Sequence, residues 1–292
     1  MKSAAWFIWN GKTSIGMGLI VNDIPPIVRP KERTSQVTIP GRAGDLTLLE
    51  GDDIYEPYTK KITVTCRNEF ITEEMLGWLR GEGELILCTE PFVYEARIAA
   101  EVSFSRIGRA VSQAVIPFWC QPYKKAQNPE RHIFTATDGM VIRNLGNVAS
   151  KPKITITGTG ALSILISDGS GDTGNQMTFT HLPGDLVIDC DAGIMKTTAK
   201  SYDGNAYYYA GDYCTYQGGA AGTYEYGLYR FTTEGIGSST EWEYVSSYVG
   251  TEYSYWWPGA WSGDYLRIPG GKSEIVINGS AGITIDPRWR WI

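Results

Sequence analysis

Short runs in which apolar and polar side chains alternate recur along most of this 292-residue chain, and they limit its fold more than any other feature. Residues 61–66 are an example, because Ile62, Val64 and Cys66 lie on one side of an extended strand. Gly, Pro, Asp and Asn separate these runs at turn positions. The pattern predicts a mainly β protein, with further strands over 85–88, 153–157, 162–166 and 274–277.

One helix is expected among these strands. Thr72 is placed to cap it, because its hydroxyl can accept from a free amide of the first turn. Met75, Leu76, Trp78 and Leu79 supply an apolar stripe, and we expect Gly81 to end the helix. A single helix among strands predicts an α+β first domain.

Turn residues gather between residues 121 and 149, and they suggest a boundary between two domains. We therefore expect an N-terminal α+β domain over residues 1–130 and a second domain over residues 140–292. Short strands at close intervals in the second part are typical of a β-sandwich.

The composition changes at about residue 202, where the chain becomes rich in Tyr, Trp and Gly. Most of the Tyr residues fall between 202 and 265, and Arg230 is the only basic residue there. We interpret residues 202–260 as a small β module inserted into the second domain.

Charge and cysteine content argue against several classes of protein. The net charge is -6, whereas a general nucleic-acid binder has a basic field. The five cysteines are widely spaced and form no zinc motif or disulfide framework. No apolar stretch is as long as a membrane span. We expect a protein made in a cytoplasm, with no cofactor, no metal and no membrane partner.

Several motifs of the first part resemble the N-terminal domain of the siphophage distal tail protein (Dit). Their order and spacing carry the likeness more than any one of them does. They are Ile24–Pro26, Ile39–Leu46, Gly51–Tyr55, Gly81–Leu85, Pro91–Arg97 and Pro117–Tyr123.

The second part resembles the galectin-like domain of the same family. The likeness rests on Asn144–Gly146, Lys151–Ile156, Asp189–Asp191, Arg267–Gly271 and Asp286–Trp291. The resemblance implies an N-terminal ring-forming domain and a galectin-like β-sandwich. It also implies a hexameric ring at the virion tail tip that joins the tail tube protein to a tail-associated or receptor-binding protein. DNA would only pass through such a ring as cargo.

The inserted module resembles small β modules of the chitin-binding type, through residues 209–216, residues 227–232 and Trp242. Flat aromatic side chains can stack on the apolar face of a sugar ring while keeping a polar group for its hydroxyls. A small β module also needs aromatics for its core, so interior packing or a protein contact remains the alternative. The candidates for binding a bacterial surface glycan are Tyr213, Tyr216, Tyr229, Trp242, Trp256 and Trp257.

Within the ring interpretation, the loop from Ile39 to Leu46 is the candidate subunit contact. Pro40 and its Gly neighbours fix the shape of this loop, and Arg42 is suited to bridge acidic groups with two hydrogen bonds. Ile39, Arg42 and Leu46 are the contact residues that we select.

Two other functional classes compete with the structural ring. One is a stand-alone adhesion protein that binds host glycan without forming rings. The other is a glycan-cleaving enzyme, which needs two nearby carboxylates such as Asp189 and Asp191. Acidic residues are common at strand ends, and the two His residues lie in no nucleophile motif. We therefore expect no enzymatic activity.

Overall fold

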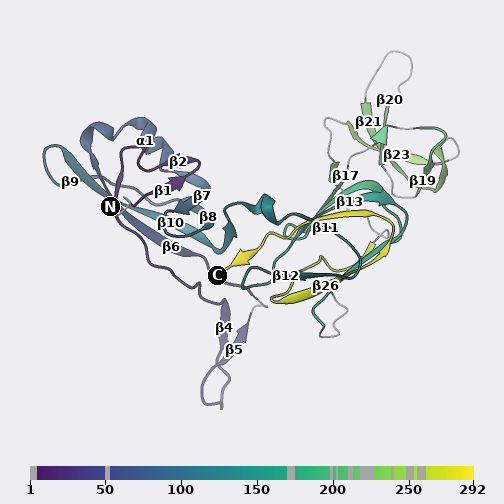
Figure 1. The fold of residues 1–292 in the computed structure, drawn as a ribbon, viewed down its shortest axis with the longest axis horizontal. Coiled ribbons are helices and arrows are strands. Elements are labelled where there is room, and N and C mark those ends of the chain that lie inside the picture. The colour runs from purple at the N-terminus through teal and green to yellow at the C-terminus, as the bar shows by residue number, and fades with distance from the viewer. Residues whose placement is uncertain are drawn as a thin grey trace. The chain divides into compact units, whose positions relative to one another are not determined.

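The computed structural model contains two compact units, each described here separately. The N-terminal unit comprises residues 1–129, 146–148 and 289–292, and the C-terminal unit comprises residues 130–145 and 149–288. Strands dominate both units (Figure 1), which confirms the expected mainly β fold. The structure describes residues 5–49, 53–169, 175–197, 200–201, 203–209, 213–217, 226–237, 240–247, 253–254 and 261–292.

A nine-stranded sheet forms the body of the N-terminal unit, with seven strands in the order β2-β1-β7-β8-β10-β6-β3. β9 and β28 also pair with β10. The strands are β1 (Phe7–Trp9), β2 (Lys12–Thr13), β3 (Ile20–Asp23), β6 (Tyr58–Arg67), β7 (Gly81–Leu87), β8 (Phe92–Ile98), β9 (Ser105–Arg106), β10 (Val111–Ala126) and β28 (Arg290–Trp291). Buried and exposed residues alternate along β6 and β10, so the sheet buries one face and leaves the other open.

Helix α1 (Glu73–Trp78) contributes Met75 and Trp78 to the core of this unit. The Thr72 hydroxyl accepts from the Met75 amide at 3.2 Å, so the expected cap is confirmed. The helix is shorter than expected, because its last turn closes at Leu79 and Gly81 already begins β7. The 3-10 turn η1 (Asn68–Phe70) precedes it.

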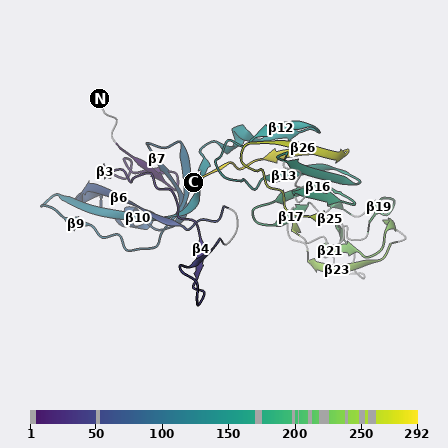
Figure 2. The ribbon, with the colours of Figure 1, turned by 90° about the horizontal axis from the view of Figure 1, so that it is seen from below.

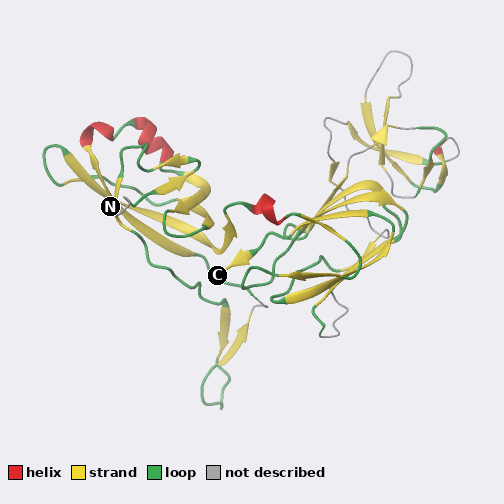
Figure 3. Ribbon diagram, viewed as in Figure 1, coloured by secondary structure: helices red, strands yellow, loops and turns green. Residues whose placement is uncertain are grey.

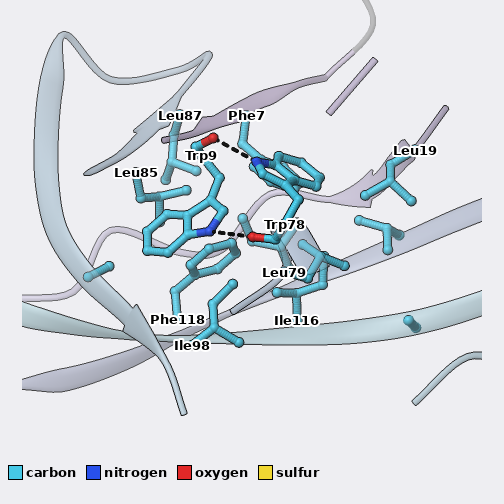
Figure 4. Packing of buried hydrophobic residues seen from close by; sticks show 14 of the residues in the cluster. Phe7, Trp9, Leu19, Trp78, Leu79, Leu85, Leu87, Ile98, Ile116 and Phe118 are labelled. Carbon is cyan, nitrogen blue, oxygen red and sulfur yellow. Dashed lines mark hydrogen bonds between the residues drawn. The ribbon is translucent and has the colours of Figure 1, made fainter. Parts of the chain in front are cut away.

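Two tryptophans link α1 to the first strand (Figure 4). The indole N–H of Trp9 donates to the Trp78 carbonyl at 3.0 Å, and the Trp78 indole donates to the Trp9 carbonyl at 2.8 Å. Phe118 packs edge-on against both Trp9 and Phe7. These bonds satisfy the indole donors inside an otherwise apolar core.

A separate hairpin also belongs to the N-terminal unit. It consists of β4 (Thr34–Val37) and β5 (Leu46–Leu49), which pair with each other and not with the nine-stranded sheet. Figures 2 and 3 show it standing away from that sheet.

The C-terminal unit contains two larger sheets that lie face to face (Figures 1 and 2). The six-stranded sheet has the order β11 (Phe134–Ala136), β27 (Gly282–Asp286), β13 (Lys153–Thr159), β16 (Pro183–Asp189), β17 (Ile194–Thr197) and β24 (Tyr253–Ser254). The five-stranded sheet has the order β12 (Met140–Arg143), β26 (Lys272–Gly279), β14 (Leu162–Ser167), β15 (Gln176–Phe179) and β25 (Trp261–Gly263). Ile154 and Ile156 of one sheet and Ile164 and Ile166 of the other are buried, as alternation predicts. The 3-10 turn η2 (Pro129–His132) precedes β11.

A smaller strand module lies between β17 and β24 in the sequence. Its four-stranded sheet has the order β18 (Lys200–Ser201), β20 (Tyr213–Gln217), β21 (Tyr226–Phe231) and β23 (Trp242–Ser247). β19 (Tyr207–Tyr208) pairs with β22 (Gly235–Ile236). The chain returns to the six-stranded sheet at β24, which pairs with β17.

Residues 289–292 complete the N-terminal unit. β28 pairs with Lys124 and Lys125 of β10, and Trp291 packs on Phe92 with ring centroids 5.1 Å apart. The Asn147 amide oxygen accepts from the Ile292 amide at 2.9 Å. A segment that follows the C-terminal unit in sequence is thus part of the first sheet.

Candidate assembly and ligand-binding surfaces

The hairpin contains the residues selected as a subunit contact. Ile39 and Arg42 are exposed in the loop, and Leu46 at the start of β5 is half-buried. Val37 and Leu48 are also exposed. A two-stranded hairpin is at best marginally stable alone in water, so one with this many exposed apolar side chains is suited to a covering partner.

The loop of the hairpin has a defined conformation. The Thr38 hydroxyl donates to the Asp45 carboxylate at 2.8 Å, and the Arg42 amide donates to the Ile39 carbonyl at 3.1 Å. Gly41 and Gly44 have φ values of 85° and 79°, which glycine adopts with little strain. Arg42 forms no ion pair with another residue of the described chain, so its guanidinium is available to a partner.

The base of the hairpin is fixed to its own unit. The Arg33 amide donates to the Ile54 carbonyl at 2.9 Å, and the Glu56 amide donates to the Lys31 carbonyl at 2.7 Å. Glu32 and Tyr55 form a β-bridge between these bonds. These backbone contacts therefore fix the base of the hairpin to the N-terminal unit, and the loop at the other end projects from it.

The open face of the nine-stranded sheet is a second candidate surface, and we call it the outer face. Ile20, Val115 and Trp119 are its exposed hydrophobic residues, with exposed fractions of 66%, 46% and 41%. β6 separates β3 from β10 and presents Lys61 and Thr63 on this face, so the exposed apolar residues are interspersed with polar ones. The sequence contained this signal, because the alternation of β10 places Val115 and Trp119 on one side, but we did not select them as a site.

A hollow of about 300 Å³ indents the outer face over β7, β8 and β10. We call it the acidic hollow; it is lined by Glu82, Gly83, Glu84, Glu95, Ala96, Arg97, Trp119 and Gln121. Arg97 lies 3.6 Å from the Glu82 carboxylate, and Lys125 forms an ion pair with Glu95. No cation of the described chain pairs with Glu84, so the hollow retains negative charge there.

The aromatic candidates of the inserted module are only partly described. Trp242 packs against Tyr229 and Phe231, with ring centroids 5.1 and 5.9 Å apart, beside the buried residues Tyr208 and Cys214. Trp242 and Tyr229 are thus half-buried and pack against the core of the module. The side chains of Tyr213 and Tyr216, and all of Trp256 and Trp257, lie outside the described residues.

Two tyrosines that we did not select are exposed on this module. Tyr207 and Tyr209 form an edge-to-face pair with ring centroids 5.1 Å apart. The ring centroid of His181 lies 3.7 Å from that of Tyr209. Tyr207 is 54% exposed. Composition alone did not separate them from the interior aromatics.

Asp189, one of the two carboxylates considered for catalysis, has a structural role. Arg288 donates to both oxygens of Asp189, at 2.8 and 3.0 Å, and the amides of Asp191 and Ala192 donate to the same carboxylate. Burial raises the pKa of Asp189, but these hydrogen bonds outweigh it and hold the pKa below its usual value. A general acid needs a raised pKa, so Asp189 is poorly suited to that role.

Other kinds of site are not evident in the described chain. No group of three or more His, Cys, Asp or Glu side chains is arranged to hold a metal ion within those residues. No helix in the same part of the chain is long and apolar enough to cross a membrane.

The fold is similar to that of the Dit protein of phage SPP1. That structure is described as a paradigm of the hub adsorption apparatus in phages that infect Gram-positive bacteria. The TM-score is 0.56 at 12% identity, and the match covers 97% of this chain and 98% of that one. No protein-family model matches the sequence, and no curated protein matches it. The expected Dit-like fold is therefore confirmed, while the likeness of the second part to galectins remains a prediction.

Proposed function

We propose that this chain is a structural subunit of a phage tail tip, and that six copies form a closed ring between the tail tube and the receptor-binding apparatus. The observation that carries the proposal is the fold likeness to a phage adsorption-hub protein over nearly the full length of both chains. In a ring built by rotation, each copy presents two different surfaces to its neighbours. The projecting hairpin and the outer face supply two such surfaces on one unit.

The proposed role is assembly, without catalysis. Arg288 forms a bidentate ion pair with Asp189 at the end of β16. This interaction stabilises the strand end and supports a structural role for the carboxylate. The proposed partners are further copies of this chain, the tail tube protein and a tail-associated or receptor-binding protein. DNA passes through the ring and is not a ligand.

The test is the molar mass of the purified chain by light scattering across a dilution series, with negative-stain electron microscopy of the largest species. A sixfold ring, or a stack of two, is the expected result. A strict monomer at every concentration, also after mixing with the tail tube protein, would contradict ring formation and favour the stand-alone adhesion protein.

Glycan binding by the inserted module is a second proposed function, which the exposed Tyr207 and Tyr209 pair favours. Host cell-wall polysaccharide is the probe, in a sedimentation assay with the intact protein. Tyr207→Ala should weaken binding, whereas Phe231→Ala should weaken it only by unfolding the module. Equal binding by the wild type and Tyr207→Ala would rule out this surface. Release of reducing ends from the same polysaccharide would contradict the non-enzymatic assignment.

A further inference from the structure

The acidic hollow has the chemistry of a receptor for an arginine side chain. Three glutamates and one arginine line it, which leaves a formal charge of -2 before Lys125 offsets Glu95. Trp119 contributes an exposed indole to the same lining. A guanidinium can stack on an indole face while it donates to neighbouring carboxylates, and an ammonium lacks that planar fit.

The strand beneath the hollow is held in place. The Asn10 side chain accepts from the Glu84 amide at 3.1 Å and donates to the Glu82 carbonyl at 3.3 Å. Gly83 lies between these two residues, and a β-carbon there would collide with the Asn10 side chain. The two glutamates therefore project from a fixed backbone toward the open side of the sheet.

The hairpin carries the complementary groups. Arg42 projects from its loop with Val37, Ile39 and Leu48 exposed nearby in the sequence. The outer face offers the exposed apolar residue Val115 on β10, one of the strands that line the hollow. The charges of the two surfaces are thus complementary, and Val115 and Trp119 offer apolar contact beside them.

We propose that the hairpin of one copy lies on the outer face of a second copy, with Arg42 in the acidic hollow between Glu84 and Trp119. This inference rests on the ring assembly proposed above and names the surfaces that join its subunits. Within one copy, Arg42 and the hollow both remain open, so their union requires another molecule. Because the two surfaces differ, the contact is heterologous and generates a ring when the rotation closes.

A charge exchange tests this pairing. Arg42→Glu and Glu84→Arg should each raise the subunit dissociation constant about tenfold or more, since each places like charges in contact. The double variant has the opposite charges exchanged at every interface and should recover most of the wild-type affinity. Arg143→Glu, an exposed change on β12 of the C-terminal unit, is the matched control and should assemble as the wild type does. Light scattering across a dilution series gives the masses.

Two results would overturn the proposed pairing without contradicting the proposal that the chain forms a ring. One is wild-type assembly by both single variants, and the other is a double variant that assembles no better than either single variant. In both cases the ring would join through other surfaces.

Crosslinking decides the case in which the wild type is monomeric by scattering. Arg42→Cys and Glu84→Cys are combined in a Cys88→Ser background and treated with a short bismaleimide. A ladder of multimers would support the pairing as a weak contact, although ring formation had failed. No ladder beyond that of an Arg42→Cys, Glu274→Cys control would overturn the pairing together with the ring.

Discussion

A buried ion pair in the N-terminal unit gives the sharpest prediction for stability. The side chains of Lys60 and Glu90 are 1% and 6% exposed, and Lys60 Nζ lies 3.5 Å from Glu90 Oε1. Lys60 also donates to the Pro26 carbonyl at 3.1 Å and lies 4.8 Å from the centroid of the Tyr94 ring. The Tyr94 hydroxyl donates to the other oxygen of Glu90.

Lys60→Met removes the cation and leaves the Glu90 carboxylate buried. Breaking such a pair from one side destabilises proteins by about 3–5 kcal/mol. The Tyr94 hydroxyl and the field of Lys124 still act on Glu90, so the lower end, about 3 kcal/mol, is expected. With a typical urea dependence, the midpoint of unfolding would fall by about 1.5 M.

The assay is urea unfolding followed by tryptophan fluorescence, in a double-mutant cycle. Lys61→Met is the matched control, because the next residue of β6 is exposed and its loss should change stability by less than about 0.5 kcal/mol. Lys60→Met with Glu90→Gln should be more stable than the sum of the single changes predicts, by about 2 kcal/mol. Equal stability of Lys60→Met and Lys61→Met would refute the reasoning.

Three further predictions concern other parts of the chain. A β-carbon at Gly146 would lie 2.1 Å from the backbone of β28, so Gly146→Ala should speed hydrogen exchange in β28, whereas Gly108→Ala, in open space, should not. Arg288 holds the pKa of Asp189 low, so this carboxylate stabilises the fold at pH values above its unfolded pKa of about 4. The wild type should therefore be more stable than Asp189→Asn at neutral pH, and the difference should shrink as the pH falls below about 4. A stability difference that does not change with pH would contradict this. Burial raises the pKa of Cys120 to about 12, so a disulfide reagent at pH 8 should modify it only in denaturant.

The sequence predicted local structure well where a repeating pattern specifies one face. The alternation over residues 61–66 and 153–157 lies within the observed strands β6 and β13, and Thr72 caps the helix. Each of these features depends on neighbours within a few residues. Periodicity and capping chemistry were therefore sufficient to find them.

Contacts between segments that are distant in the sequence could not be predicted from periodicity or capping residues. β28 contains two residues, and so short a strand has no pattern that indicates its partner or register. The acidic hollow forms because β7, β8 and β10 pair side by side in particular registers. The alternation of side chains within one strand does not specify which strand lies next to it or in which register. Aromatic residues of the module were ambiguous because the half-buried Trp242 and the exposed Tyr207 are both favoured in strands.

The pairing of β28 with β10 also bears on how the chain is made. Lys124 leaves the ribosome long before its partner Trp291, and at typical synthesis rates the interval is roughly ten to thirty seconds. The whole C-terminal unit is translated during that time, while this part of β10 lacks one neighbour. An unpaired strand edge is a site for wrong association. The first sheet therefore has its full set of strands only after residues 289–292 have been synthesised.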